Sequence, residues 1–275
     1  MRVILVPVAD RPECTRALQT AFDIGKRIGA SVTGCHVRPH RYSEVALSPG
    51  FPDAVWRKKC TSEAPAAAKA LYREIAAQNG YQVIRRPRAT PGAIWCERVG
   101  TPDRILGIVG PVADLIVVSR PAKPRSVADM FLKAALFRSS RPVLLLPPKN
   151  RRVVGRRVVI AWNQSAQAAL CVTAAMPILQ HAQSVTIVTC GQEDRPGPKS
   201  TQLAAYLAQW GVKAERAVAP GKRVEAALLQ ACKERRADLL ISGAYSRRRW
   251  RERLFGGTTE YLVRKARMPV LMLHR

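Results

Sequence analysis

Residues 239–266 carry the clearest potential for chemistry in this sequence. An apolar segment, 239–242, is followed by a glycine-containing loop, and a glycine pair stands where a helix is expected to begin. Glycine leaves backbone N–H groups uncovered, and a helix N-terminus favours an anion. The block therefore predicts a phosphate cradle. Its candidate binding residues are Gly243, Ser246, Gly256, Gly257 and Thr258.

The same block allows plainer interpretations. In one of them, the Gly256-Gly257 pair does no more than allow a tight turn into the helix. The arginine-rich run Arg247–Arg253 could meet a phosphate, nucleic acid or an acidic partner, but such a run is more often a solvated loop, which is the reading we favour. Trp250, inside the run, could stack on a base; we expect it instead to anchor the loop to its domain.

Catalytic and metal chemistry find little support. The four histidines show no ligand spacing, so no metal site is expected. His36 follows an apolar segment, and we expect it to be buried with its hydrogen bonds satisfied. Nucleophile motifs and acid–base constellations are missing, so no catalytic residue is assigned. At most, we expect a weak ATPase.

Cysteine usage and composition indicate a reduced, cytoplasmic location. The seven cysteines contain no CxxC pair, and Cys14, Cys171 and Cys232, on predicted helices, read as small core residues. The chain is 47% hydrophobic and 24% charged, and it lacks the ~18 uninterrupted apolar residues of a membrane span. We therefore expect no membrane partner.

The net charge of +27, from 46 Lys+Arg against 19 Asp+Glu, suggests nucleic acid as a partner. The charge is spread along the chain, however, and aromatic residues are only 6% of it. Stacking platforms for single strands are therefore scarce, and a basic surface without a specific nucleic-acid site is the favoured interpretation.

The sequence contains the same structural unit twice. The segments opening with Arg2 and Arg157, the pair 113–118 and 237–242, and the pair 141–146 and 268–273 recur in the same order. The predicted domains are 1–150 and 151–275. Each alternates strands and helices, which predicts an α/β fold with a doubly wound, parallel, five-stranded sheet. Ligands of such sheets bind beyond the carboxyl ends of the strands, where the strand order switches.

The first half also has an insertion, Arg41–Cys60, rich in proline, glycine and aromatic residues. We expect a surface loop there, with a lid over a ligand or partner site as the alternative.

The doubled unit and the glycine block resemble the universal stress protein family in its tandem form. Its ATP-binding members share a signature of Gly, two residues, Gly, nine residues, Gly, then Ser or Thr, after the fourth strand. This chain keeps the spacing from Gly243 onward, with Ser246 in place of the second glycine and Gly257 in place of the hydroxyl residue. The family's aspartate after the first strand corresponds to Asn163. The first half has Val8 there, although Asp10 is near, and lacks the loop glycines.

This resemblance implies a cytoplasmic stress-response protein, regulatory or protective, that binds ATP or another adenine nucleotide in its second domain. It also implies that the two domains pack as a pseudo-dimer through strands 143–146 and 270–273, with homodimerisation as a further possibility. Two alternatives stay open. One is a nucleotide-independent scaffold or chaperone-like protein, and the other is a basic nucleic-acid-associated protein.

Overall fold

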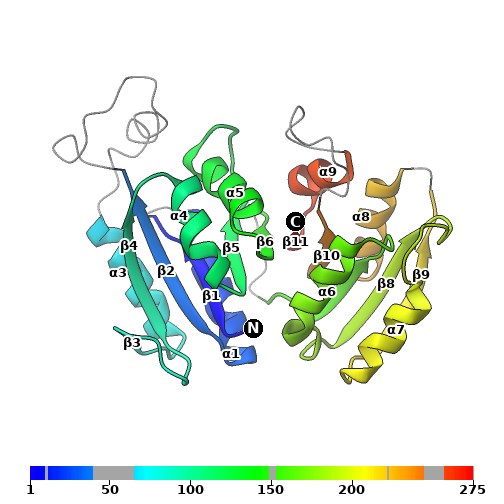
Figure 1. Ribbon diagram of the computed structural model, residues 1–275, viewed down its shortest axis with the longest axis horizontal. Helices are drawn as coiled ribbons and strands as arrows, with labels where there is room; N and C mark the ends of the chain where they lie inside the picture. Colours follow the sequence, from blue (N-terminus) through cyan, green and yellow to red (C-terminus); the bar gives the residue numbers. More distant parts are fainter. Residues whose placement is uncertain (10–11, 40–64, 149–152, 222, 245–256, 275) are drawn as a thin grey trace. The chain divides into compact units, whose positions relative to one another are not determined.

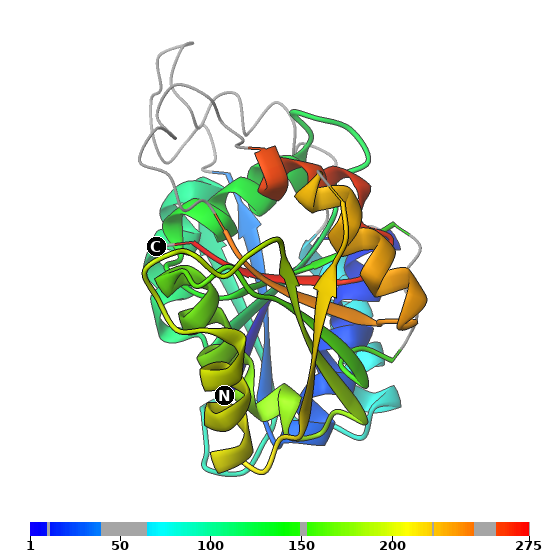
Figure 2. The same ribbon diagram turned by 90° about the vertical axis from the view of Figure 1, so that its right-hand side faces the viewer.

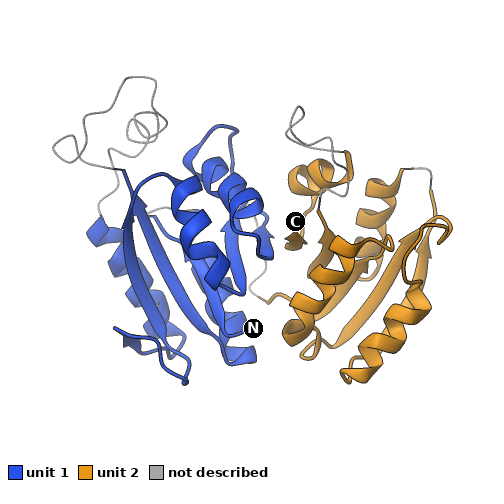
Figure 3. Ribbon diagram, in the orientation of Figure 1, with its two compact units in different colours: residues 1–148 blue, residues 149–275 orange. Residues whose placement is uncertain are grey.

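The structure is a computed structural model that describes residues 1–9, 12–39, 65–148, 153–221, 223–244 and 257–274. It divides into two compact units, Met1–Pro148 and Lys149–Arg275, coloured blue and orange in Figure 3. Both units are built from parallel strands joined by helices (Figure 1). Ser246, Gly256, Asp10, the insertion Arg41–Cys60 and the run Arg247–Arg253 lie outside the described residues.

Unit 1 is a parallel sheet with the strand order β3-β4-β2-β1-β5-β6. Its elements are β1 (Val3–Pro7), α1 (Pro12–Ile28), β2 (Ser31–Arg38), α3 (Pro65–Gln78), β3 (Val83–Ile84), β4 (Ala93–Val99), α4 (Pro102–Val109), the 3-10 helix η1 (Gly110–Val112), β5 (Leu115–Ser119), α5 (Val127–Arg138) and β6 (Val143–Leu146).

Unit 2 repeats this plan with the strand order β11-β10-β7-β8-β9. Its elements are β7 (Arg157–Ala161), α6 (Ala166–Leu179), β8 (Ser184–Cys190), α7 (Ser200–Gln209), β9 (Ala214–Ala219), α8 (Val224–Glu234), β10 (Leu239–Gly243), α9 (Gly257–Lys265) and β11 (Val270–Leu273). Figure 2 shows α6 and α7 on one face of this sheet and α8 and α9 on the other. The predicted doubly wound α/β fold is confirmed, and unit 1 adds the two-residue edge strand β3 to the five-strand frame.

The sequence explains why these segments form strands and helices. Four consecutive apolar residues are buried in each of β6 and β11, as expected for strands covered on both faces. In α6 one apolar face is buried as a whole, and Ser165 is the N-cap, accepting a hydrogen bond from the backbone N–H of Ala168. That face consists of Ala168, Val172, Ala175, Met176 and Leu179.

One aspartate in each unit fastens the start of the first strand. Asp114 Oδ2 accepts hydrogen bonds from the backbone N–H groups of Arg2 and Val3, at 2.5 and 3.0 Å. Asp238 does the same in unit 2, accepting from the three successive N–H groups of residues 155–157 at 2.7, 2.9 and 3.0 Å. The repeated Ala-Asp-Leu landmark of the sequence is therefore a structural anchor. A carboxylate can satisfy several backbone donors at once, and such charge-assisted bonds are strong.

Among the described residues, every helix is too short or too polar to cross a membrane.

Candidate functional site

The carboxyl edge of the unit 2 sheet carries the predicted binding residues that the structure describes. Ala161 of β7 is paired with Ser242 of β10, so Asn163 and Gly243 follow the carboxyl ends of two neighbouring strands. Strand β7 lies between β8 and β10, which makes this the point where the strand order switches. Helix α9, which begins at Gly257, joins β10 to its parallel neighbour β11, and its N-terminus therefore belongs to this same edge.

Gly243 is needed for close packing at this edge. A Cβ built on it would lie 2.8 Å from the backbone nitrogen of Ala168 and 3.2 Å from the Cα atom of Ala168. Strand β10 therefore ends directly against the first turn of α6, and no other residue type fits without movement. The glycine has a structural reason that sequence reasoning, which considered only the ligand, did not find.

Asn163 stabilises the start of α6 through its side-chain oxygen, and its side-chain amide N–H₂ group is exposed. Its Oδ1 accepts hydrogen bonds from the backbone nitrogen and the hydroxyl of Ser165, at 3.2 and 2.7 Å. The side chain is exposed, and within the described part of the chain its Nδ2 group donates no hydrogen bond. An asparagine at this position can thus fix the helix start through its oxygen and present its amide N–H₂ outward.

Gln164 is a residue that the sequence analysis missed. Its backbone has φ 60°, a left-handed conformation, and its side chain is buried. Its Nε2 donates to the carbonyl oxygens of Arg195 and Gly197, at 2.9 and 3.1 Å, and its Oε1 accepts from the Arg195 nitrogen at 3.2 Å. Trp162 Nε1 also donates to the carbonyl oxygen of Pro198, at 2.9 Å. The loop between β8 and α7 is thereby fixed against the loop after β7.

The start of α9 presents an open backbone. Gly257 is exposed, and a Cβ built on it would meet no atom of the described residues within 4 Å. Thr258 is half-buried and Thr259 is buried in the same first turn. The first N–H groups of a helix lack intrahelical partners and, together with the helix dipole, attract negative charge. The described start of α9 is thus of the kind that suits an anion, and the assignment of Gly257 and Thr258 to a phosphate stays a prediction.

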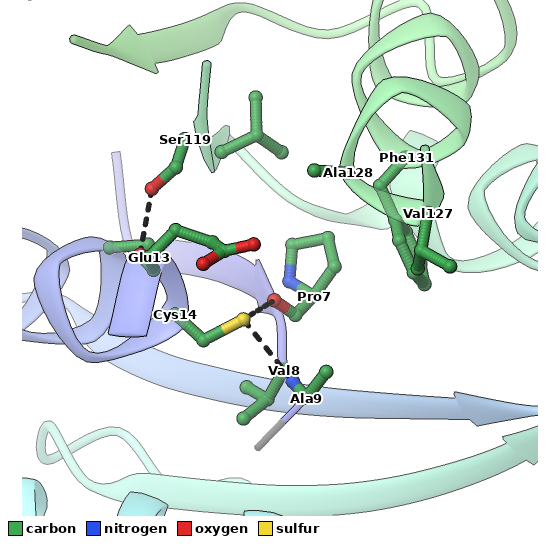
Figure 4. A pocket seen from close by; sticks show the side chains of 11 residues that line it. Pro7, Val8, Ala9, Glu13, Cys14, Ser119, Val127, Ala128 and Phe131 are labelled. Carbon is green, nitrogen blue, oxygen red and sulfur yellow. Dashed lines mark hydrogen bonds between the residues drawn. The ribbon is translucent and has the colours of Figure 1, made fainter. Parts of the chain in front are cut away.

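Unit 1 has a different arrangement at its corresponding edge, between β1 and β5. The carbonyl oxygen of Glu13 in α1 accepts a hydrogen bond from the hydroxyl of Ser119, the counterpart of Gly243, at 2.7 Å (Figure 4). Beside it lies a cavity of about 40 Å³ lined mostly by apolar side chains. A cavity needs roughly 10–15 Å³ of volume on this measure to hold one water molecule, so the described part of this cavity has room for a few waters. The side chains around it in Figure 4 include Pro7, Val8, Cys14, Val127 and Phe131.

His36 differs from the expectation. Its side chain is buried, at 2% exposure, as predicted. Neither ring nitrogen has a hydrogen-bond partner among the described residues, so the prediction of satisfied hydrogen bonds is wrong. The ring stacks on Trp95 with a centroid distance of 6.2 Å. Burial lowers the pKa of His36 and keeps the ring neutral, which reduces the cost of leaving it unpartnered.

Cys35 and Cys96 form a thiol pair that the sequence spacing does not reveal. They are register partners on the neighbouring strands β2 and β4. A hydrogen bond from the Cys35 thiol lowers the pKa of Cys96 to about 7, while the same pairing and burial raise that of Cys35. Cys171 and Cys232 are fully buried, as predicted, whereas Cys14 is half-buried beside the unit 1 cavity. No group of three potential metal ligands occurs among the described residues.

The fold and the site together define a class of protein: a tandem pair of doubly wound α/β units with a glycine-containing loop at the carboxyl edge of the second. The model of the Universal stress protein family matches residues 191–274. This match lies within the second unit, and it confirms the resemblance stated from the sequence. Among curated protein sequences, none matches the chain significantly.

Solved structures place the whole chain in the same fold. It is similar to a universal stress protein from Archaeoglobus fulgidus, with a TM-score of 0.68 and 16% identity, covering 99% of this chain and 98% of that chain. A putative universal stress protein from Pseudomonas aeruginosa gives a TM-score of 0.58 at 15% identity, with coverages of 99% and 93%. A protein of unknown function from Pseudomonas aeruginosa gives 0.59 at 14%, with coverages of 99% and 92%. The tandem arrangement is thus shared over the full length.

Proposed function

We propose that this chain is a cytoplasmic stress-response protein, regulatory or protective, whose second unit binds ATP or another adenine nucleotide. The proposed site contains Asn163 beside the ribose or adenine and Gly243, Ser246, Gly256, Gly257 and Thr258 around the phosphates. Unit 1 takes no nucleotide in this proposal, because its corresponding loop after β5 lacks the glycines. The two units are proposed to pair as a pseudo-dimer, and homodimerisation is the further possibility.

One observation carries the proposal. Asn163 and Gly243 follow the carboxyl ends of adjacent strands at the switch in strand order, and α9 begins there with an exposed, unobstructed Gly257. Doubly wound sheets bind ligands at this place, and a helix N-terminus suits a phosphate. The exposed amide N–H₂ of Asn163 adds a donor that can meet a ribose oxygen or a ring nitrogen.

A matched pair of variants at Gly257 tests the proposal. Gly257→Asp places a carboxylate at the first turn of α9, where a side chain has room and where negative charge favours the helix. The fold should therefore be kept, while repulsion weakens ATP binding by at least about 10-fold, or about 1.4 kcal/mol. Gly257→Asn has the same shape without the charge, and it should bind ATP nearly as well as the wild type. Isothermal titration calorimetry at millimolar ATP measures both.

Wild-type protein that gives no binding heat and no rise in melting temperature with ATP or ADP contradicts the proposal. The nucleotide-independent scaffold would then be the better reading of the family fold. Equal loss of binding in the Asp and Asn variants would contradict the placement of the phosphates at α9.

A further inference from the structure

A second concave site lies in unit 2, at the opposite edge of the sheet. It is a pocket of about 600 Å³ lined by residues of α8 and α9 and by residues at the amino ends of β10 and β11. Pockets of roughly 300–1,000 Å³ are the usual size for small-molecule ligands. The proposed nucleotide site does not share a residue with it. Its principal lining residues are Leu229, Gln230, Cys232, Lys233, Arg236, Asp238, Tyr261, Lys265, Arg267 and Met268.

The pocket has a strong excess of positive charge. Lys233, Arg236, Lys265 and Arg267 line it, and none of the four forms an ion pair within the described part of the chain. Their sequence neighbours are paired: Arg235 with Glu234, and Arg264 with Glu260. The carboxylate of Asp238, the one acidic lining residue, is already occupied by three backbone N–H groups. The Asp238 carboxylate is therefore directed to the backbone. Among the described residues, it forms no ion pair with the four cations.

Helix ends explain only part of this charge. Both α8 and α9 terminate at the pocket, and cations in a last helical turn offset the partial negative charge there. Lys233 and Lys265 stand in those last turns, so both have this structural reason. Arg236 and Arg267 lie beyond the helix ends, and the same reason does not extend fully to them.

Arg236 also stands where glycine would be favoured. Its backbone has φ 49°, and it closes the end of α8, with the N–H of Ala237 donating to the carbonyl oxygen of Cys232 at 2.8 Å. A side chain in this left-handed conformation costs about 1–2 kcal/mol relative to glycine. The chain keeps an arginine side chain at the pocket despite this cost.

Part of the pocket lining is apolar. Leu229, Cys232 and Met268 belong to this apolar lining, and Tyr261 adds an aromatic ring. Guanidinium groups bind phosphate through two parallel hydrogen bonds, and an apolar lining suits the organic part of a ligand. We propose that this pocket binds a phosphorylated small molecule, with its phosphate at Arg236 and Arg267 and its organic part against the apolar lining.

Pyridoxal 5′-phosphate is a suitable probe, because it carries a phosphate and an aromatic ring. Its aldehyde forms an imine with a nearby lysine amine, and borohydride reduction makes the link permanent. We expect saturable labelling of Lys233 or Lys265, located by peptide mass spectrometry, and protection by inorganic tripolyphosphate. Labelling spread evenly over Lys199, Lys213 and the pocket lysines, or a lack of protection, would overturn the proposal.

The variant Arg236→Gly/Arg267→Gln removes both phosphate contacts. Glycine relieves the left-handed backbone at residue 236, so the melting temperature should not fall through that change. The probe concentration for half-maximal labelling should rise at least about 10-fold, as expected for the loss of about 1.4 kcal/mol or more. The control Lys213→Gln/Arg216→Gln removes two equally exposed cations in and beside β9. It should change this concentration less than about 2-fold, because neither residue lines the pocket.

Gly257→Asp separates this pocket from the proposed nucleotide site. It should leave the labelling of the pocket lysines unchanged, whether or not the protein binds ATP. A comparable loss of labelling in Gly257→Asp would mean that the probe occupies the other edge, and the pocket proposal would fail.

Discussion

Gly243 has a predicted role in ligand binding and an observed role in packing. The sequence presents it as the first glycine of a phosphate loop, and the structure shows it pressed against the backbone of Ala168. Its counterpart in unit 1 is Ser119, whose hydroxyl donates to the carbonyl oxygen of Glu13. The strand therefore contacts the first helix of its unit through a glycine in unit 2 and through a serine hydroxyl in unit 1.

We predict that Gly243→Ala destabilises unit 2 by about 1–3 kcal/mol, because the methyl group overpacks against a backbone that cannot easily yield. Urea denaturation followed by circular dichroism measures the shift in midpoint. Gly257→Ala is the control, since its methyl group meets open space and should leave the midpoint unchanged or slightly higher. Equal midpoints for the two variants would show that the close approach of β10 to α6 is not a constraint.

Several structural details lay beyond sequence reasoning for physical reasons. Gln164 adopts a left-handed backbone that glutamine seldom takes, and only its contacts with the 195–197 loop account for it. The unpartnered nitrogens of His36 are a property of its surroundings rather than of its residue type. Asn163, in contrast, could be found, because its place after the first strand depends only on the chain order.

At the scale of elements, the register of neighbouring strands creates sites that spacing along the chain conceals. Cys35 and Cys96 are far apart in sequence, yet β2 and β4 place them as direct partners. The doubly wound parallel sheet could be predicted from the alternating strands and helices, since such alternation allows few topologies. The register could not, because several apolar residues in a row satisfy a buried strand equally well.

This register leads to a pH-dependent prediction for Cys96. The thiolate is the nucleophile, and the pKa of Cys96 is lowered to about 7 by the hydrogen bond from Cys35. Its alkylation by iodoacetamide should therefore rise with pH around a midpoint near 7, and already be substantial at neutral pH. Peptide mass spectrometry of samples quenched at successive pH values gives the rate for this cysteine alone.

The variant Cys35→Ala is the matched control for Cys96. Loss of the donated hydrogen bond should move the midpoint upward, toward the ordinary thiol value of about 8.5. A midpoint that stays the same in this variant would mean that the pair does not share a proton. Cys171 serves as an internal reference, because burial raises its pKa to about 12 and its reaction should be slow throughout.

At the scale of the whole molecule, charge is the dominant property. A net charge of +27 attracts polyanions whether or not a specific site exists. The pocket between α8 and α9 differs from this general attraction, because four cations without an ion pair among the described residues share it with apolar lining residues. The difference between general and local attraction can be measured with salt.

We predict that the protein binds duplex DNA of random sequence at low salt and loses most of that affinity between roughly 50 and 200 mM salt. Release of counterions makes non-specific binding fall by about 10³–10⁵ over that range when several phosphates are contacted. A mobility-shift titration at the two salt concentrations measures the change. Binding that persists at the higher concentration would favour the nucleic-acid-associated alternative over the non-specific one.

The aspartate anchors also set an order of events during synthesis. Asp114 is 112 residues beyond the Arg2 nitrogen that it fastens, and Asp238 is 83 residues beyond Gly155. The first strand of each unit thus leaves the ribosome long before its anchor exists. In each unit, the first strand lacks its anchor until the aspartate before β5 or β10 has been synthesised. A growing chain that ends before this aspartate therefore cannot complete the fold of the unit.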